Sequence, residues 1–324
     1  MILRIFLLLI ALIPLMAAGG AVAEDRPEYD LKLTVEEGEI DLGKPIPFTV
    51  TLAKRKGKAH QVNALRLARN SVSLRVDIGG KKRTITRIYG QVQKSAKGRV
   101  SVRDDKPPMQ ELKRGHPLEL ELPVLAIRTG ELTFRALYTG LPKGKGPAIL
   151  KSGDVVVKVV APEGKKEIAA RMVTSEGEMV FTFNTDATYN TTLNFLTLAK
   201  AGRYEGLTFH RIVADFMAQG GDPKGNGTGG PGYCIHREID ATVKHDRGVL
   251  SMARSEAPNS GGSQFFVMFG PRPSLDGAYA AFGKMVEGKK TLEALEAVET
   301  DPRSHEKSRP IQPPVIRKVE VITR

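Results

Sequence analysis

Short runs in which apolar and polar residues alternate fill the first half of the chain. The clearest runs span residues 31–35, 48–52, 72–78, 118–122 and 132–136. A period of two places the apolar side chains on one face of a strand and the polar ones on the other, as a half-buried antiparallel strand requires. Together with a more uniformly apolar run at 155–160, about seven such strands, separated by Gly, Pro and charged turns, predict a β-sandwich. An immunoglobulin-like arrangement is an architectural guess, because the Cys…Trp…Cys signature of antibody domains is absent.

The pattern changes after residues 161–166, which combine Pro, Gly and charge and are predicted to be a linker. The elements predicted beyond it are a strand at 179–183, a helix at 189–201, a second helix at 290–298 and a final strand at 315–322. Gly202 stands where a helix C-cap would be. The sequence is therefore mainly β in both halves, with two helices in the second.

The start of the chain has the pattern of a secretory signal peptide. Arg4 precedes an almost wholly apolar run at 5–16, and small residues follow up to Ala23. An A-x-A ending after a short apolar core predicts cleavage after Ala23 and export to the periplasm, the cell envelope or the exterior. An uncleaved membrane anchor is the alternative, because residues 5–22 are nearly long enough to cross a bilayer, although Pro14 weakens that interpretation.

Length and cysteine content limit the architecture further. The 324 residues suggest two domains at roughly 100–200 residues each. The predicted division is a signal peptide at 1–23, a β-sandwich domain at 24–160, the linker at 161–166 and a second domain at 167–324. The single cysteine, Cys234, excludes an intrachain disulfide and a Cys-rich metal site.

The net charge of +13 is concentrated in the first half. Residues 24–160 hold 27 Lys+Arg against 16 Asp+Glu, a net charge of +11, with basic clusters at 54–58, 81–83 and 94–103. Such clusters are suited to docking on an anionic envelope polymer or a membrane surface. Solvated loops at strand ends are the plainer interpretation. No nucleic-acid motif accompanies the charge, and an exported protein seldom meets nucleic acid, so no nucleic acid is expected as a partner.

The familiar catalytic motifs do not account for the second half. Residues 225–230 fit G-x-G-x-x-G, but Pro231 follows where a dinucleotide-binding helix would have to begin. The histidines lack the spacing of a zinc site, and no G-x-S-x-G elbow marks a nucleophile. Cys234 is interpreted as a small buried apolar residue. What remains is a set of aromatic residues, a methionine, amides and one arginine, a composition typical of an apolar binding site with a polar edge.

Seven ordered segments carry a resemblance to a known family. They are Phe209-His210-Arg211-Ile212-Val213, Phe216 to Asp222, Gly227 to Gly230, Gly248 to Ala253, Pro258 to Phe266, Leu275-Asp276-Gly277 and Phe282-Gly283-Lys284. In these segments, from about residue 167 to the end, the chain resembles the cyclophilin family of peptidyl-prolyl cis-trans isomerases, most closely its compact bacterial members. The resemblance implies a closed eight-stranded antiparallel β-barrel capped by two helices. It implies neither a metal nor an organic cofactor.

By the same resemblance, specific residues take specific roles. Arg211, Gln219 and Phe266 match the catalytic set, in which the arginine donates a hydrogen bond to the twisted amide and the glutamine supports it. The residues that match the substrate site are Phe216, Met217, Phe266 and Leu275 around the proline ring, Tyr279 at its wall, and Ala253, Gln264 and the backbone of Arg254 along the groove for preceding residues.

Three positions depart from the family pattern. Ser274 stands where many members carry tryptophan, so cyclosporin binding is expected to be weak. Tyr279 replaces a frequent histidine and keeps an apolar wall with a polar tip. Arg254 replaces a frequent asparagine, at a position where the family uses mainly backbone groups.

The sequence thus predicts an exported peptidyl-prolyl isomerase that acts on proline-containing polypeptides, with the first domain serving recruitment or localisation. A non-catalytic module that holds proline-containing segments is the alternative. The presence of Arg211 favours the enzyme, because binding alone does not require stabilisation of a transition state.

Overall fold

The computed structural model describes residues 28–36, 38–68, 71–87, 90–94, 100–104, 109–144 and 146–324. The predicted signal peptide at 1–23 and the side chains of the basic cluster at 94–103 lie outside this part of the chain. Within the described residues, no helix combines the length and the apolar character needed to cross a membrane.

All the regular elements that the structure describes in the first region are strands. They are β1 (Tyr29–Thr34), β2 (Glu39–Asp41), β3 (Pro45–Lys54), β4 (His60–Asn63), β5 (Val72–Ile78), β6 (Lys81–Ile85), β7 (Gly90–Lys94), β8 (Val100–Asp104), β9 (Met109–Leu112), β10 (Leu118–Leu125), β11 (Gly130–Tyr138), β12 (Leu150–Lys151) and β13 (Val155–Val160). One sheet has the order β1-β3-β10 and the other β2-β13-β11-β5-β6, with β12 beside β11. The pairs β4–β9 and β7–β8 form two smaller sheets.

The two larger sheets pack through the apolar faces that the alternation predicts. Along β3, Phe48, Val50 and Leu52 are buried while the residues between them are not. The Phe48 ring meets the ring of Phe134, on β11, with centroids 4.8 Å apart. The runs of period two therefore form a two-sheet core. The immunoglobulin-like arrangement stays a prediction, and β2 runs parallel to β13.

The second region contains one large sheet and two α-helices. Its elements are β14 (Ile168–Thr174), β15 (Gly177–Phe183), α1 (Tyr189–Lys200), β16 (Arg211–Val213), β17 (Met217–Gly220), β18 (Val249–Met252), β19 (Phe265–Met268), η1 (Pro273–Leu275), β20 (Ala280–Glu287), α2 (Lys289–Glu296), η2 (His305–Lys307) and β21 (Ile316–Thr323). Both predicted helices are confirmed to within a few residues.

The sheet of the second region is open, so the closed barrel predicted from the resemblance is wrong. Its order is β16-β17-β19-β18-β20-β15-β14-β21, and β16 does not pair with β21. A few backbone hydrogen bonds join residues 206–209, which precede β16, to residues 314–316 at the start of β21, including Phe209 N to Pro314 O at 2.9 Å and Ile316 N to Leu207 O at 2.7 Å. The proline just before β21 has no N–H to donate, which prevents a continuous ladder at this seam.

Helix α1 begins and ends at residues with clear physical roles. The carboxylate of Glu238 accepts hydrogen bonds from the backbone N–H of Asn190 (3.1 Å) and Thr191 (2.7 Å), which the helix itself cannot satisfy. Burial raises the pKa of Glu238, and these hydrogen bonds oppose the rise. Gly202 follows the helix with φ 67°, a conformation that glycine adopts without a steric penalty.

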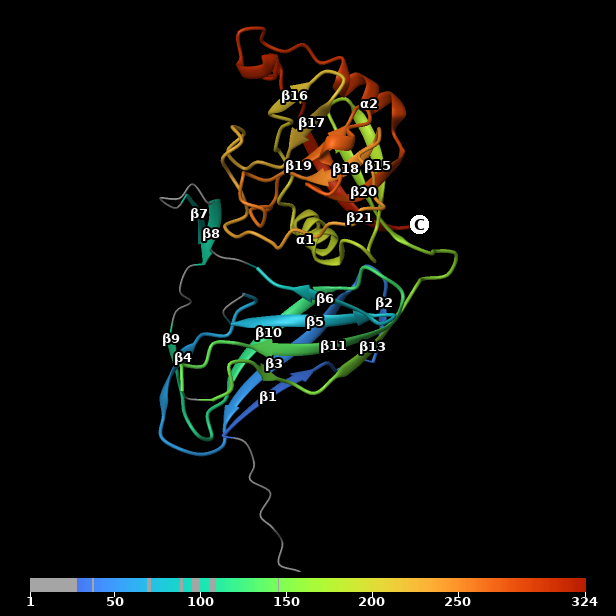
Figure 1. The fold of residues 1–324 in the computed structure, drawn as a ribbon. Helices are drawn as coiled ribbons and strands as arrows, with labels where there is room; N and C mark the ends of the chain where they lie inside the picture. The colour runs from blue at the N-terminus through green and yellow to red at the C-terminus, as the bar shows by residue number, and fades with distance from the viewer. Residues whose placement is uncertain are drawn as a thin grey trace, which may run out of the picture.

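The face of the second region that carries α1 lies against the first region (Figure 1). The Arg83 guanidinium, on β6, donates two hydrogen bonds to the carbonyl of Asp186 (3.0 and 2.5 Å), just before α1. At the other end of the helix, Lys200 Nζ donates to Gly43 O (2.9 Å). Strands β16 and β17 lie at the end of the second region away from this contact (Figure 1).

The connection between the regions contains neither helix nor strand between Ala161 and Glu167. Beside it, the backbones of Glu167 and Arg324 exchange two hydrogen bonds, each of 3.0 Å. The predicted linker at 161–166 falls on this segment. That each side of the linker folds as a separate domain stays a prediction.

Candidate active site

The centre of the candidate site is a row of residues that lie opposite one another on neighbouring strands. Arg211 on β16 faces Gln219 on β17, and Gln219 faces Phe266 on β19. Because side chains alternate along a strand, the next pair of the hairpin, Ile212 and Ala218, points into the main core instead. Cross-strand register thus places together the three residues predicted to be catalytic, although Phe266 is distant in sequence from the other two.

An apolar cluster separate from the main core lies beside this row. Its buried members are Met217, Val249, Ala253, Phe266, Met268 and Ala281, with Val213, Phe216, Val243, Leu275 and Tyr279 packed against them. We call this set the Phe266 cluster. The Phe266 ring is 5% exposed and meets the Tyr279 ring edge-on at 5.8 Å. Every apolar residue that the resemblance assigned to the substrate site belongs to this cluster.

Arg254 covers one side of the cluster with its side chain. Its guanidinium lies over the Tyr279 ring, 4.5 Å from the centroid, and its Nε donates to Ala278 O at 3.1 Å. A small hollow lined in part by Arg254, Met252 and Pro258 adjoins it. The prediction gave Arg254 a role through its backbone alone, whereas the structure also places its side chain on the wall residue.

A chain of amide hydrogen bonds supports Arg211 from the side of β19. Arg211 Nη1 donates to Gln219 Oε1 (3.4 Å), and Gln219 Nε2 donates to Gln264 Oε1 (2.9 Å). Gln264 Nε2 in turn donates to the carbonyls of Gly227 (3.0 Å) and Gly229 (2.8 Å). Both glutamines therefore have fixed orientations, and Gln219 presents its oxygen to the guanidinium.

The glycine loop at the end of this chain is organised by Asp222. Its carboxylate, 1% exposed, accepts hydrogen bonds from the backbone N–H of Lys224 (2.8 Å), Asn226 (3.0 Å) and Gly227 (2.5 Å). Burial alone would raise the pKa of Asp222, but these hydrogen bonds outweigh it and lower the pKa. Residues 225–230 form a loop with no helix. No helix begins at Pro231 either, so the prediction that residues 225–230 are not a dinucleotide-binding motif is confirmed.

Comparison with known proteins gives the arrangement a family. Residues 169–321 match the model of the cyclophilin type peptidyl-prolyl cis-trans isomerases. A peptidyl-prolyl cis-trans isomerase of Synechococcus elongatus is 42% identical over 134 residues, which cover 41% of this chain and 90% of the relative. The chain belongs to the cyclophilin family.

Other cyclophilins match over a similar part of the chain. The isomerase-like 2 protein of Cryptococcus neoformans is 43% identical over 165 residues, 49% of this chain and 28% of that protein. The chain thus spans little more than a quarter of the length of this relative. A solved Cryptosporidium parvum cyclophilin type isomerase, crystallised in the presence of the dipeptide Ala-Pro, is 36% identical, covers 48% of this chain and 99% of its own, and has a TM-score of 0.45.

Sequence reasoning missed a buried polar group behind the Phe266 ring of this cyclophilin. His245 lies between Asp276 Oδ1 (2.9 Å from Nδ1) and Ser251 Oγ (3.0 Å from Nε2), and its ring stacks on Phe266 at 6.3 Å. The hydrogen bond from His245 lowers the pKa of Asp276. The Ser251 side chain is fully buried, so it cannot reach a substrate as a nucleophile. The stacked imidazole and its two hydrogen-bond partners therefore support the Phe266 ring from behind.

Glu306 is a second residue that the sequence analysis missed. Its Oε2 accepts hydrogen bonds from Arg211 Nε (3.1 Å) and Nη2 (2.5 Å). This hydrogen bonding lowers the pKa of Glu306. The two residues are 95 positions apart, and no spacing in the sequence connects them.

Neither the single cysteine nor the side chains that could bind a metal were expected to form a reactive centre. Cys234 is half-buried rather than fully buried, and burial raises the pKa of its thiol, which disfavours the nucleophilic thiolate. Among the residues that the structure describes, no group of three His, Cys, Asp or Glu side chains is arranged to hold a metal ion.

The substitution Asp222→Asn tests the support of the glycine loop. We expect it to lower the free energy of unfolding by about 1–3 kcal/mol, because an amide cannot accept all three buried hydrogen bonds. A carboxylate with a lowered folded-state pKa contributes stability above its ordinary pKa, near 3.8, and loses it as the pH falls through the lowered value. The difference between wild type and variant in urea denaturation should therefore shrink below about pH 4.

The matched control is Asp246→Asn, in which an exposed aspartate loses its charge. Its effect on stability should be small. A wild-type advantage over Asp222→Asn that is equally large at acid and neutral pH would contradict the assignment.

Proposed function

We propose that this cyclophilin is an active peptidyl-prolyl cis-trans isomerase. The observation that carries the proposal is the placement of Arg211 Nη1, next to Gln219 Oε1 and 3.7 Å from Met217 Sδ, at the border of the Phe266 cluster. A fixed cationic donor beside an apolar cluster is what rotation of an X–Pro bond requires.

The chemistry follows from the amide itself. Resonance holds the X–Pro bond planar behind a barrier of about 18–20 kcal/mol, and no covalent bond has to break for it to rotate. In the twisted state the prolyl nitrogen regains a lone pair that can accept a hydrogen bond. Arg211 can donate to that nitrogen while the Phe266 cluster holds the proline ring, and its guanidinium keeps its charge at any working pH. Stabilising the twisted state more than the planar one accelerates both directions.

Replacement of Arg211 tests this proposal directly. Arg211→Ala should reduce kcat/KM for an Ala-Pro peptide on the order of a hundredfold, because a hydrogen-bond donor to the transition state is lost. The cis-trans exchange of the peptide is measured by NMR exchange spectroscopy, with the full-length protein as the catalyst. The control is Arg171→Ala, which removes an exposed arginine of β14 that lies near Glu178 and Glu320.

The alternative is a module that binds proline-containing segments without catalysis. It predicts that the folded wild-type protein binds the peptide and leaves its isomerisation rate unchanged. That result would exclude the enzyme.

We propose that the protein is exported, because the N-terminal sequence matches a cleavable signal peptide. N-terminal sequencing of the protein recovered from the cell envelope or medium should give Glu24 as the first residue. Recovery of an intact Met1 in a membrane fraction would instead support the anchor.

We propose further that the first region localises the isomerase on an anionic membrane surface or envelope polymer. In the structure, some cations of the basic clusters are already paired and others are exposed. Arg55 pairs with Asp30, and Arg83 donates to the second region, so these cations are already engaged. Lys81 and Lys82 on β6 are exposed. They are the members of the cluster at 81–83 whose side chains are open to an anionic surface. The alternative is that these lysines are only solvated at a strand end.

Binding to phosphatidylglycerol vesicles tests the surface. Each lysine near an anionic membrane contributes about 1 kcal/mol, so Lys81→Ala with Lys82→Ala should weaken wild-type binding roughly thirtyfold at low salt. Wild-type binding should also fall steeply between low and physiological ionic strength. Binding that is indifferent to both changes would exclude an electrostatic role for these residues.

A further inference from the structure

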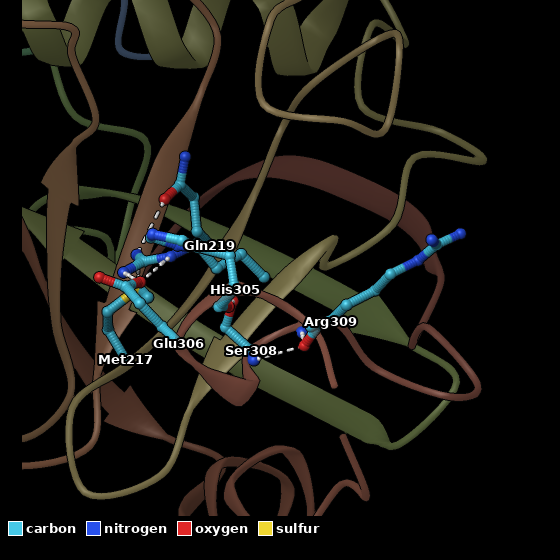
Figure 2. Close-up of polar contacts among 8 residues, drawn as sticks. Met217, Gln219, His305, Glu306, Ser308 and Arg309 are labelled. Carbon is cyan, nitrogen blue, oxygen red and sulfur yellow. Dashed lines mark hydrogen bonds and ion pairs between the residues drawn. The ribbon is translucent and has the colours of Figure 1, made fainter. Parts of the chain in front are cut away.

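The arginine of the candidate site has a charged partner outside the seven segments on which the resemblance rests. Arg211 Nε and Nη2 both donate to Glu306 Oε2, whereas Nη1 is directed to Gln219 and Met217. Glu306 comes from η2, between α2 and β21, and lies close to Met217 and Gln219 in Figure 2. Two different edges of one guanidinium are therefore held by two different parts of the chain.

The backbone that presents Glu306 is strained. Glu306 has φ 56° and its neighbour Lys307 has φ 49°. Residues with a β-carbon rarely adopt this left-handed conformation, and each instance costs about 1–3 kcal/mol. Such a cost persists only where surrounding contacts determine the conformation, and it is found preferentially at functional sites.

The surrounding contacts are present on both sides of the turn. Ser304 Oγ accepts hydrogen bonds from the backbone N–H of Ser308 (3.0 Å) and Arg309 (3.1 Å), and Ser308 Oγ donates to His305 O (2.7 Å). Figure 2 shows Ser308 and Arg309 next to Glu306 in this turn. The Ser308 carbonyl then accepts from Ile212 N (2.8 Å), the residue that follows Arg211. The turn is thus attached to the same strand that carries the arginine.

The ion pair between Arg211 and Glu306 stabilises the fold too little to account for the strained turn. The Arg211 side chain is 30% exposed and that of Glu306 is 48% exposed. Ion pairs at this exposure contribute between nothing and about 1 kcal/mol, which is less than the strain of the two left-handed residues. The pair therefore lowers the energy of the fold little, while it restricts the orientation of a side chain that is otherwise flexible.

The restriction leaves the donors needed for catalysis available. A guanidinium carries five N–H groups. Glu306 accepts two of them, on Nε and Nη2. Nη1 donates to Gln219 and makes only a long contact with Met217 Sδ (3.7 Å), which a substrate can replace. The carboxylate thus fixes the plane of the guanidinium without occupying the edge that borders the Phe266 cluster.

We propose that Glu306 is a positioning residue for X–Pro isomerisation, holding Arg211 so that Nη1 is presented to the twisted amide. This inference rests on the proposed isomerase function. Glu306 lies on η2, whereas the neutral support of Arg211 comes from Gln219 and Gln264.

The kinetic test uses Glu306→Ala and Glu306→Gln in the full-length protein with an Ala-Pro peptide. A misplaced catalytic group costs transition-state stabilisation rather than substrate binding, so Glu306→Ala should lower kcat about tenfold with little change in KM. Glu306→Gln keeps an acceptor oxygen and should recover part of the loss. Glu293→Gln, which removes an exposed charge near Lys289 on α2, is the matched control and should behave as wild type.

Two further measurements separate positioning from a structural effect. In an Arg211→Ala background, adding Glu306→Ala should change kcat no further, because the two residues act through one another. The Arg211 Nε–H signal in NMR spectra should be protected from solvent exchange in wild type and lose that protection in Glu306→Ala. An equal fractional loss of kcat in both backgrounds would mean a structural effect and would overturn the proposal.

The remaining outcomes distinguish this proposal from the function on which it rests. An unchanged kcat in Glu306→Ala would overturn the positioning role and leave the isomerase function intact. A higher kcat would do the same, and it would show that Glu306 competes with the substrate for Arg211. A wild-type protein that binds the peptide without accelerating its isomerisation would overturn both.

Discussion

The candidate site depends on the register of β17 between its two neighbours. This strand pairs with β16 on one side and β19 on the other, so Gln219 lies opposite both Arg211 and Phe266. Its adjacent residue, Ala218, points into the main core and is fully buried. A shift of one residue would exchange the two faces, placing the amide in the core and the alanine at the site. Burial of the core face therefore specifies the geometry of the polar face.

Arg211 receives support of two physical kinds. On one side, neutral amides lead through Gln219 and Gln264 to a loop fixed by a buried carboxylate. On the other side, Glu306 supplies a full negative charge in contact with solvent. Neutral dipoles orient the guanidinium without reducing its charge, whereas a carboxylate orients it more strongly and offsets part of that charge. Glu306, on η2 outside the sheet, thus decides both how firmly the guanidinium of Arg211 is oriented and how much of its positive charge remains for a substrate.

The sequence predicted those features that depend on local periodicity or on contiguous motifs. The alternation along β3 and the end of α1 at Gly202 are local signals, and the structure agrees with both. The open seam was missed because it depends on how two edge strands meet, which no single segment encodes. Glu306 was missed for a related reason. Its left-handed backbone is unfavourable for its residue type, and only the contacts of the folded turn make it possible.

The hydrogen bonds between Glu167 and Arg324 have a consequence for the architecture of the whole chain. They bring the entrance and the exit of the second region to one place, at the edge formed by β14 and β21. A unit whose ends lie side by side can be joined to a new neighbour without rearranging its interior. The cyclophilin region is in this sense transplantable.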